Sequence, residues 1–233
     1  MKLKIIYVLC EGQTEQGFVE DVLKPYLTEQ GVNSVKSILL STDKKKNTSG
    51  GMFSFTQAHS HLDILNKMHQ DSEYEHYVFT TMFDYYALPS SFPKYNESQK
   101  IEDKYKKIEF LENAFSEYEQ NKRFIPYLQL HEFEALVFCG IEYLPKLYPG
   151  CEKRIKTLQD ALSITSNPEL INNNPNTAPS KRIIKAIEGE KKKVIYHYNK
   201  PSTGKYITKQ VGIEVLRSKC KHFNEWIEKL LSD

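Results

Sequence analysis

Five carboxylates follow three apolar segments of the sequence, each within a few residues of the end of its segment. Glu11 and Glu15 follow the first segment, Asp84 ends the second, and Glu132 and Glu134 follow the third. If the segments are neighbouring parallel strands, these side chains meet at one edge of a sheet. Clustered carboxylates suit a hard cation such as Mg²⁺ or Mn²⁺. The spacing therefore predicts a metal site for phosphoester chemistry, in which a glutamate that does not bind the ion acts as general base.

The same carboxylates also have a purely structural interpretation. Acidic residues are favoured in the first turn of a helix, because the amino end of the helix dipole is positive. Carboxylates at strand ends then cap helices and stay solvated. The sequence alone leaves both interpretations open.

His131 stands directly before this third pair of acids. The segment His131–Glu134 resembles half of the zinc motif HExxH, but position 135 is Ala135 instead of the second histidine, which excludes a zinc protease of that type. His131 is therefore expected to be a buried neighbour of the carboxylates, and it is a catalytic candidate as a proton shuttle. The sequence also lacks a GxSxG nucleophile elbow and a Walker loop.

Basic residues at two places are candidates for contact with phosphate or nucleic acid. Lys45 lies in a lysine run within a polar loop, and Lys181 and Arg182 fall in the first turn of a helix that Ser180 begins. A helix start attracts anions through its free amide groups, and the two cations add to that attraction. Lysine runs are also typical of a solvated surface. Tyr85 and Tyr86 can stack on a base or pack on the sheet.

The elements that position these residues alternate along the chain. Hydrophobic patterns predict strands at 3–10, 35–40, 77–83 and 123–130, and helices that end at Gln30, span 53–69 and span 100–120. This alternation predicts an α/β fold, with a mostly parallel sheet flanked by helices. Beyond Pro149 the pattern becomes mainly helical, with a possible edge strand at 193–198. We therefore expect an α/β domain at 1–149 and, at 150–233, a mainly helical C-terminal extension packed on the same core.

Composition narrows the class of protein further. The 32 basic and 30 acidic residues nearly cancel, so nucleic-acid contact would have to come from local patches. The longest apolar run is too short to span a membrane, and the chain start does not resemble a signal peptide. The four cysteines form no CxxC pair, which fits a reducing compartment. A cytoplasmic protein is expected.

Several motifs of the chain resemble a known domain. These motifs are EGQTE (11–15), TTMFDYYALP (80–89), RFIPYLQLHEFEALVF (123–138), NTAPSKR (176–182) and VGIEVLRSKCKHFNEW (211–226). Together they resemble a bacterial family of Toprim-like proteins with a domain of unknown function, related to the Toprim domain of OLD-type nucleases. The resemblance implies a Toprim-like fold and a nuclease that uses Mg²⁺ or Mn²⁺ to cleave nucleic acid. It also implies a partner ATPase from a neighbouring gene and a role in anti-phage defence.

The resemblance assigns roles to individual residues. Glu11 matches the Toprim glutamate of acid or base catalysis, and Asp84 matches the first aspartate of the DxD metal motif. Tyr86 holds the place of the second aspartate, so Glu132 or Glu134 would replace the missing ligand.

Glu15 resembles the second acid of the EGxxE pattern that begins at Glu11. The leading hypothesis is thus a metal-dependent nuclease. One alternative is a non-catalytic Toprim-like partner or regulator of an ATPase, and another is a nucleotidyl transferase.

Overall fold

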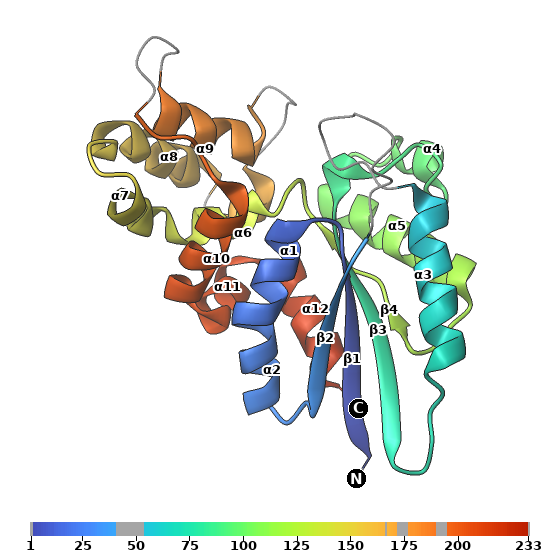
Figure 1. Ribbon diagram of the computed structural model, residues 1–233. Helices are drawn as coiled ribbons and strands as arrows, with labels where there is room; N and C mark the ends of the chain where they lie inside the picture. The colour runs from blue at the N-terminus through green and yellow to red at the C-terminus, as the bar shows by residue number, and fades with distance from the viewer. Residues whose placement is uncertain (1, 41–53, 166, 172–176, 190–194, 233) are drawn as a thin grey trace.

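A parallel β-sheet with helices on both faces forms the centre of the protein (Figure 1). The computed structural model describes residues 2–40, 54–165, 167–171, 177–189 and 195–232. The strands are β1 (Leu3–Cys10), β2 (Ser34–Leu39), β3 (Glu75–Asp84), β4 (Phe124–Ile125) and β5 (Leu128–Gln129). Their order is β2-β1-β3-β4, with β5 also paired to β3, and every pairing among the described strands is parallel. The predicted α/β fold is confirmed.

The central strand β1 supplies side chains to two separate cores. Ile6, Val8 and Cys10 belong to one apolar cluster, whereas Tyr7 and Leu9 belong to the other. Successive side chains of a strand point to opposite faces of the sheet. Because both faces are covered, nearly every residue of the strand must be apolar, as the sequence pattern predicted.

The connection from β1 to β2 is helical but not one regular helix. It consists of α1 (Gln13–Phe18), a π-helical segment η1 (Val19–Leu23) and α2 (Lys24–Glu29). Pro25 lies in the first turn of α2, and proline has no N–H for the bond to the carbonyl four residues earlier. The widened turn accommodates this gap, a detail that the hydrophobic pattern did not predict.

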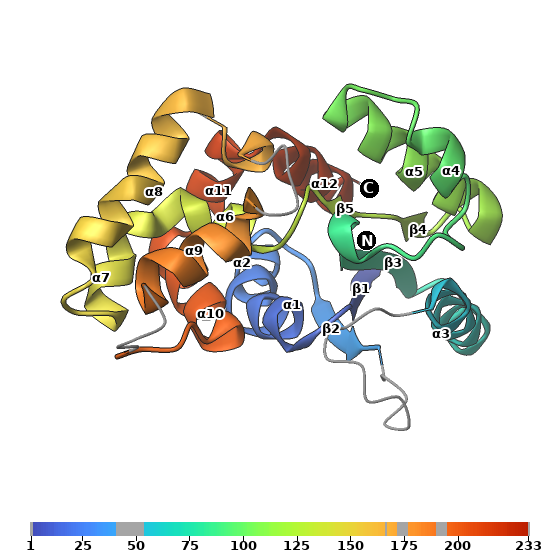
Figure 2. The ribbon, with the colours of Figure 1, turned by 90° about the horizontal axis from the view of Figure 1, so that it is seen from above.

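Helices between residues 55 and 119 cover the face of the sheet that lies opposite α1 and α2. They are α3 (Phe55–Met68), α4 (Tyr95–Ser98) and α5 (Lys104–Glu119), with a 3₁₀ turn η2 (Tyr85–Ala87) after β3. Ser54 caps α3 through a hydrogen bond from Gln57 N to its Oγ (3.2 Å), and Asp103 caps α5 in the same way. Figure 2 shows α3 and α5 on one side of the sheet and α1, α2 and α12 on the other.

The fourth predicted strand, 123–130, is divided in the structure. β4 and β5 are separated by Pro126 and Tyr127, and Pro126 has no N–H to contribute to a ladder. Side chains of β3 replace the missing ladder bonds. Thr81 Oγ1 accepts from Tyr127 N and donates to Tyr127 O, both at 3.0 Å, and Thr80 Oγ1 donates to Ile125 O at 2.5 Å.

The second half of the chain is mainly helical, as predicted. Its elements are α6 (Glu134–Val137), η3 (Phe138–Tyr143), α7 (Leu144–Leu147), α8 (Glu152–Thr165), η4 (Pro168–Leu170), α9 (Pro179–Glu188), α10 (Lys200–Val211), α11 (Ile213–Lys219) and α12 (Lys221–Leu231). The possible edge strand at 193–198 is wrong for its described part, because residues 195–198 have no regular structure.

The last helix anchors this half to the sheet. Trp226 Nε1 donates to Thr80 Oγ1 of β3 at 2.9 Å, and the indole stacks on Tyr127 at 4.2 Å. One apolar cluster contains Val8 from β1 together with Ile183 and Trp226 from the C-terminal helices. That cluster includes side chains from both sides of residue 149. The proposed division of the chain at 149/150 stays a prediction. In the described part of the chain, no helix is long and apolar enough to cross a membrane.

Candidate functional site

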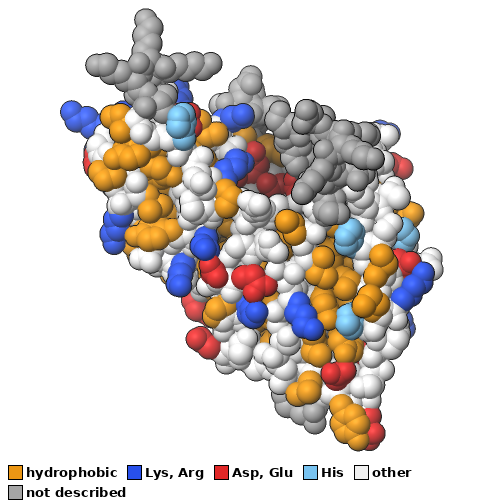
Figure 3. Space-filling model, viewed as in Figure 1, with side chains coloured by type: hydrophobic (Ala, Val, Ile, Leu, Met, Phe, Trp, Pro, Cys, Tyr) orange, Lys and Arg blue, Asp and Glu red, His pale blue; other side chains and the backbone are white. Residues whose placement is uncertain are grey.

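The carboxyl ends of the strands bring the predicted carboxylates to one edge of the sheet. Cys10 at the end of β1 pairs with Met82, and Asp84 at the end of β3 pairs with Gln129 of β5. The residues that follow these ends are therefore neighbours in space. Figure 3 shows acidic side chains gathered in a hollow at the upper edge of the molecule, with basic side chains beside them.

Backbone amides link the carboxylates of the three strand ends in sequence. Asp84 N donates to Glu11 Oε2 at 3.1 Å, and Phe133 N donates to Asp84 Oδ1 at 2.8 Å. The first bond joins the end of β3 to the residue that follows β1, and the second joins the segment after β5 to the end of β3. Glu11, Asp84 and the segment containing Glu132 and Glu134 thus meet, as the sequence predicted. We call Glu11, Glu15, Asp84, Glu132 and Glu134 the carboxylate cluster.

Glu15 enters this cluster from the first turn of α1. Gly12 is the N-cap, and its N–H donates to Glu15 Oε2 at 2.9 Å, which is the glutamate half of a capping box. The Glu15 side chain is buried, with 6% of the residue exposed. Glu15 therefore caps the helix, as the structural interpretation proposed, yet it does so inside the cluster and away from solvent.

Glu132 is held by the start of another helix. Ser180 N donates to Glu132 Oε2 at 2.9 Å, and Ser180 Oγ donates to Glu132 Oε1 at 3.0 Å. The sequence predicted that Ser180 begins this helix and that its amino end attracts an anion. In the structure α9 begins one residue earlier, at Pro179. In the structure that anion is a carboxylate of the same chain.

The predicted phosphate-contact residues lie at the same helix or outside the described residues. Lys181 is exposed in the first turn of α9, and Arg182 Nε donates to Thr177 O at 2.8 Å. Their contact with phosphate stays a prediction. Lys45 lies outside the described residues.

Sequence reasoning missed the basic residue of the cluster. Lys200, the first residue of α10, forms an ion pair with Glu134 Oε1 at 3.0 Å, and Tyr198 Oη donates to the same oxygen at 3.5 Å. Glu134 is 1% exposed, and a buried carboxylate needs such partners. The segment Asn199-Lys200-Pro201 is a helix-start pattern that places Lys200 in a first turn, but no pattern indicates which strand end it reaches.

Gly204 allows α10 to approach closely enough for this ion pair. A Cβ atom at Gly204 would lie 2.7 Å from Cε1 of Phe133 and 3.2 Å from Cγ2 of Thr14. Such distances are too short for carbon atoms, so only glycine fits without displacement. The position of Lys200 therefore depends on a glycine in the second turn of its helix.

Burial raises the pKa of most carboxylates in the cluster. Burial raises the pKa of Glu11 to about 8 despite the amide of Asp84, and Glu15 adds to the effect. The pKa of Glu15 is raised to about 7, first by burial and then by Glu134. Burial and the surrounding carboxylates also hold the pKa of Asp84 and of Glu134 above their usual values. Like charges out of water favour the protonated forms.

The pKa of Lys200 is raised as well, which for an ammonium group favours the charged form. Burial alone lowers the pKa of its ammonium group, but Glu134 and Glu132 outweigh burial and hold the pKa above its usual value. Lys200 is therefore a permanent cation among five carboxylates. Among the described residues, Lys200 is the one cation that forms an ion pair with the cluster, so acidic groups outnumber basic ones there. A bound divalent cation would neutralise this excess of negative charge.

The donor set fits a hard cation, although the side chains are not arranged around one point. Among the described His, Cys, Asp and Glu residues, no group of three or more is placed so that one ion could bind all of them. Mg²⁺ commonly binds one or two carboxylates and completes its shell with water and phosphate oxygens. Glu11 and Asp84, joined through the Asp84 amide, are the pair that would hold such an ion.

His131 is buried beside the cluster, as predicted. Only 4% of the residue is exposed, and its backbone is left-handed, with φ of 64°. Burial and then Lys104 lower the pKa of its imidazole to about 4, so it is neutral at physiological pH.

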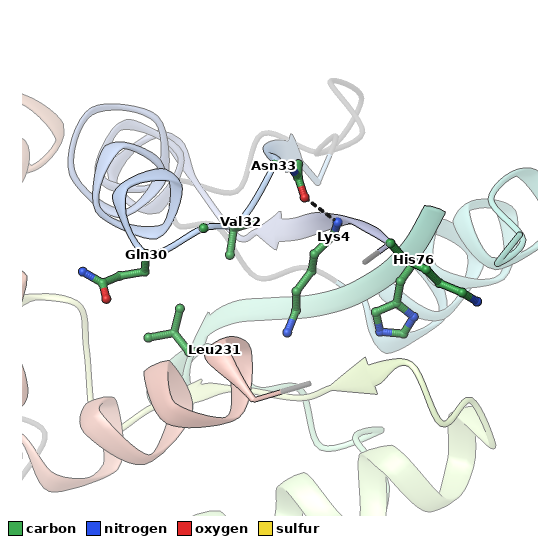
Figure 4. Close-up of a pocket in the computed structure, with 8 residues that line it drawn as sticks. Lys4, Gln30, Val32, Asn33, His76 and Leu231 are labelled. Atoms are coloured by element: carbon green, nitrogen blue, oxygen red, sulfur yellow. Dashed lines mark hydrogen bonds between the residues drawn. The ribbon is translucent and has the colours of Figure 1, made fainter. Parts of the chain in front are cut away.

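A cleft lies at the opposite edge of the sheet from the carboxylate cluster, near the amino ends of β1 and β3 (Figure 4). Its volume is about 420 Å³, and Lys2, Lys4 and His76 are among the residues that line it. Asn33 Oδ1 accepts from Lys4 N there at 2.8 Å. The described residues that line this cleft include no member of the carboxylate cluster, so it is a separate site.

A family model covers nearly the whole chain, from residue 10 to residue 231, and so includes the complete carboxylate cluster. The chain belongs to the family described as Domain of unknown function (DUF4276). Neither a curated protein nor a solved structure matches it. In this DUF4276 chain, the matched residues extend from the end of β1 through α12, so the C-terminal helices that supply Ser180 and Lys200 belong to the family region.

Proposed function

We propose that this DUF4276 protein is a metal-dependent nuclease of Toprim type that hydrolyses phosphodiester bonds. The observation that supports the proposal most directly is the convergence of five carboxylates and one lysine at the carboxyl ends of parallel strands. Open α/β sheets bind their ligands at that edge. The EGQTE and FDYY motifs add a resemblance to Toprim domains.

Glu11 and Asp84 are the proposed ligands of Mg²⁺ or Mn²⁺, and water and phosphate oxygens would complete the shell of the ion. Glu132 and Glu134, which the sequence also predicted as ligands, are not placed to bind the same ion together with them. A bound ion would polarise a phosphoryl oxygen and lower the pKa of a bound water. Tyr86 stands in place of the second aspartate of the DxD motif, so this position supplies no carboxylate to the ion.

Glu15 is the proposed general base or acid. Its pKa of about 7 lies close to physiological pH, where a group can both accept and release a proton. In hydrolysis, the oxygen of water bonds to phosphorus and the ester P–O bond breaks. The Glu15 carboxylate takes a proton from the attacking water, and the leaving oxygen takes a proton from solvent water.

Lys200 and the α9 start are the proposed contacts for the phosphate backbone. Lys200 is 43% exposed at its side chain while its ammonium group contacts Glu134, so part of the side chain is open to solvent and would be available to a phosphate. Lys181 and Arg182 extend this positive surface. Such contacts position the backbone without reading the sequence.

Cleavage by a matched pair of variants tests the proposal. Plasmid DNA, single-stranded DNA and tRNA are incubated with the protein and Mn²⁺ or Mg²⁺. Glu11→Gln keeps an acceptor for Asp84 N but removes the charge, so we expect it to abolish cleavage. Glu142→Gln changes an exposed glutamate and is expected to cleave like the original chain. Equal cleavage by Glu11→Gln contradicts the proposal.

A second candidate is a non-catalytic partner that binds an ATPase encoded by a neighbouring gene. Two observations favour it: the ion pair of Lys200 with Glu134 already compensates one buried carboxylate, and three described ligands do not converge on one ion. Co-expression with the ATPase tests it. A stable complex without cleavage of any nucleic acid supports this candidate over the nuclease.

A further inference from the structure

A small cavity lies next to the carboxylate cluster. Tyr85, Tyr86 and His131 line it from the strand ends, and Lys104 and Lys107 line it from the first turn of α5. Glu102 and two apolar residues complete the lining. Its volume is about 170 Å³, close to the roughly 150 Å³ that holds one benzene molecule in a protein interior. The cavity therefore has the size of a single aromatic ring system.

His131 gives this cavity an unsatisfied polar group. The residue is 4% exposed, and neither Nδ1 nor Nε2 has a hydrogen-bond partner among the residues that the structure describes. Nearly all buried polar side chains in proteins are hydrogen-bonded, so an exception calls for a ligand, ion or water. A neutral imidazole offers one donor and one acceptor. The edges of nucleobases carry donors and acceptors of the same kind.

A backbone hydrogen bond holds Tyr86 beside His131 in the lining of the cavity. Tyr86 N donates to His131 O at 3.1 Å, and the two ring centroids are 5.0 Å apart with planes at 48°. The φ of 64° at His131 lies in the left-handed region, which non-glycine residues occupy rarely and often at functional sites. Tyr86 is 38% exposed, so part of its ring is open to solvent.

Two lysines bring positive charge to the same cavity. Burial and the neighbouring Lys107 hold the pKa of Lys104 below its usual value, which indicates that the two ammonium groups repel each other. An anion between them relieves this repulsion. The cavity thus combines an aromatic surface, a donor and acceptor pair, and a site for negative charge.

We propose that this cavity binds one nucleobase of a nucleotide, which stacks on Tyr86 and hydrogen-bonds to His131, while Lys104 and Lys107 contact its phosphate. Asp84 directly precedes Tyr85, and Glu132 directly follows His131. A base held here places the adjoining phosphodiester at the carboxylate cluster. The inference deepens the proposed nuclease function and rests on it for the identity of the substrate as nucleic acid.

Binding of mononucleotides without metal tests the inference separately from cleavage. AMP, GMP, CMP and UMP are titrated in EDTA and followed by saturation-transfer NMR, with ribose 5-phosphate as a probe that lacks the base. We expect at least one nucleotide to bind and ribose 5-phosphate to bind much more weakly. Removing one aromatic stacking partner weakens binding about fivefold to a hundredfold, so Tyr86→Leu should lower the affinity by that factor.

Three further variants make the result specific. Tyr74→Leu removes a tyrosine that is 72% exposed elsewhere and is expected to bind nucleotide like the original chain. Lys107→Met is expected to weaken nucleotide binding while leaving binding of the free nucleoside unchanged. Glu11→Gln, which lacks the charge needed for cleavage, is expected to retain nucleotide binding.

Three outcomes overturn the inference: no mononucleotide binds, ribose 5-phosphate binds as well as the nucleotides, or Tyr86→Leu binds like Tyr74→Leu. A chain that binds nucleotides with these variant effects but cleaves no nucleic acid retains the base site and loses only the proposed nuclease function.

Discussion

Replacing Glu11 by glutamine is expected to stabilise the metal-free protein at alkaline pH while it removes the proposed activity. Glu11 lies at the end of β1, where its carboxylate accepts from Asp84 N at 3.1 Å. Glutamine has nearly the same shape and keeps an oxygen for that bond, so the substitution removes charge and little else.

The magnitude follows from the pKa of Glu11. Folding raises this pKa from 4.5 to about 8, and each pKa unit corresponds to about 1.36 kcal/mol, so the cost of ionising Glu11 in the folded state is at most about 5 kcal/mol. Glu15 lies in the same cluster and becomes easier to ionise when Glu11 is neutral. We therefore expect a net gain of about 1–3 kcal/mol for Glu11→Gln at pH 9.

The sign of the pH dependence is fixed by the direction of the shift. Between pH 4.5 and about 8 the folded chain binds more protons at Glu11 than the unfolded chain does, so stability falls as the pH rises. Glutamine does not titrate. The difference between the variant and the original chain should be near zero below pH 4.5 and should grow up to pH 9.

Urea denaturation in EDTA at five pH values from 5 to 9 measures this difference. Glu142→Gln, at an exposed position, is the control and should show little change in its difference from the original chain. A stability difference for Glu11→Gln that does not vary with pH would refute the reasoning, and so would a loss of stability at pH 9.

Three further substitutions test the elements that build the site. Gly204→Ala is expected to crowd the neighbouring phenylalanine ring, to destabilise the fold by about 1–3 kcal/mol and to weaken cleavage, as measured by urea denaturation and nuclease assay. Trp226→Phe loses the hydrogen bond to β3 and should lower the unfolding free energy by about 1–3 kcal/mol. Burial lowers the pKa of His222, but Glu112 outweighs it and the net pKa is raised. The stability that His222 contributes is therefore present below pH 6.5 and lost at higher pH, so the difference from His222→Gln should shrink as the pH rises.

The sequence was sufficient to predict the sheet because each strand carries its own pattern. β1 is apolar on both faces, and this pattern requires cover on both sides. The same patterns located the strand ends and hence Glu11 and Asp84. Local breaks were harder to predict. Pro126 divides the fourth strand, and the compensating bonds come from Thr80 and Thr81, which only the fold brings near.

The part of the site that could not be predicted depends on tertiary packing. Lys200 reaches Glu134 because α10 packs against α1 and α6, and that packing requires Gly204 to lie against Phe133. Neither Lys200 nor Gly204 is close to Glu134 in the sequence. The start of α9 was predictable from local signals to within one residue, but its anion, Glu132, was not.

Calorimetric titration with Mn²⁺ tests the central claim, that the carboxylate cluster is a divalent-cation site, most directly. Asp84→Asn keeps an acceptor for Phe133 N and removes one charge, and Glu142→Gln serves as the control. The account predicts that the original chain and the control bind Mn²⁺ with micromolar affinity. It also predicts that Asp84→Asn binds about tenfold more weakly or worse, since even the partners of metal ligands have effects of that size. Absence of Mn²⁺ binding by the original chain, or equal binding by Asp84→Asn, would contradict it.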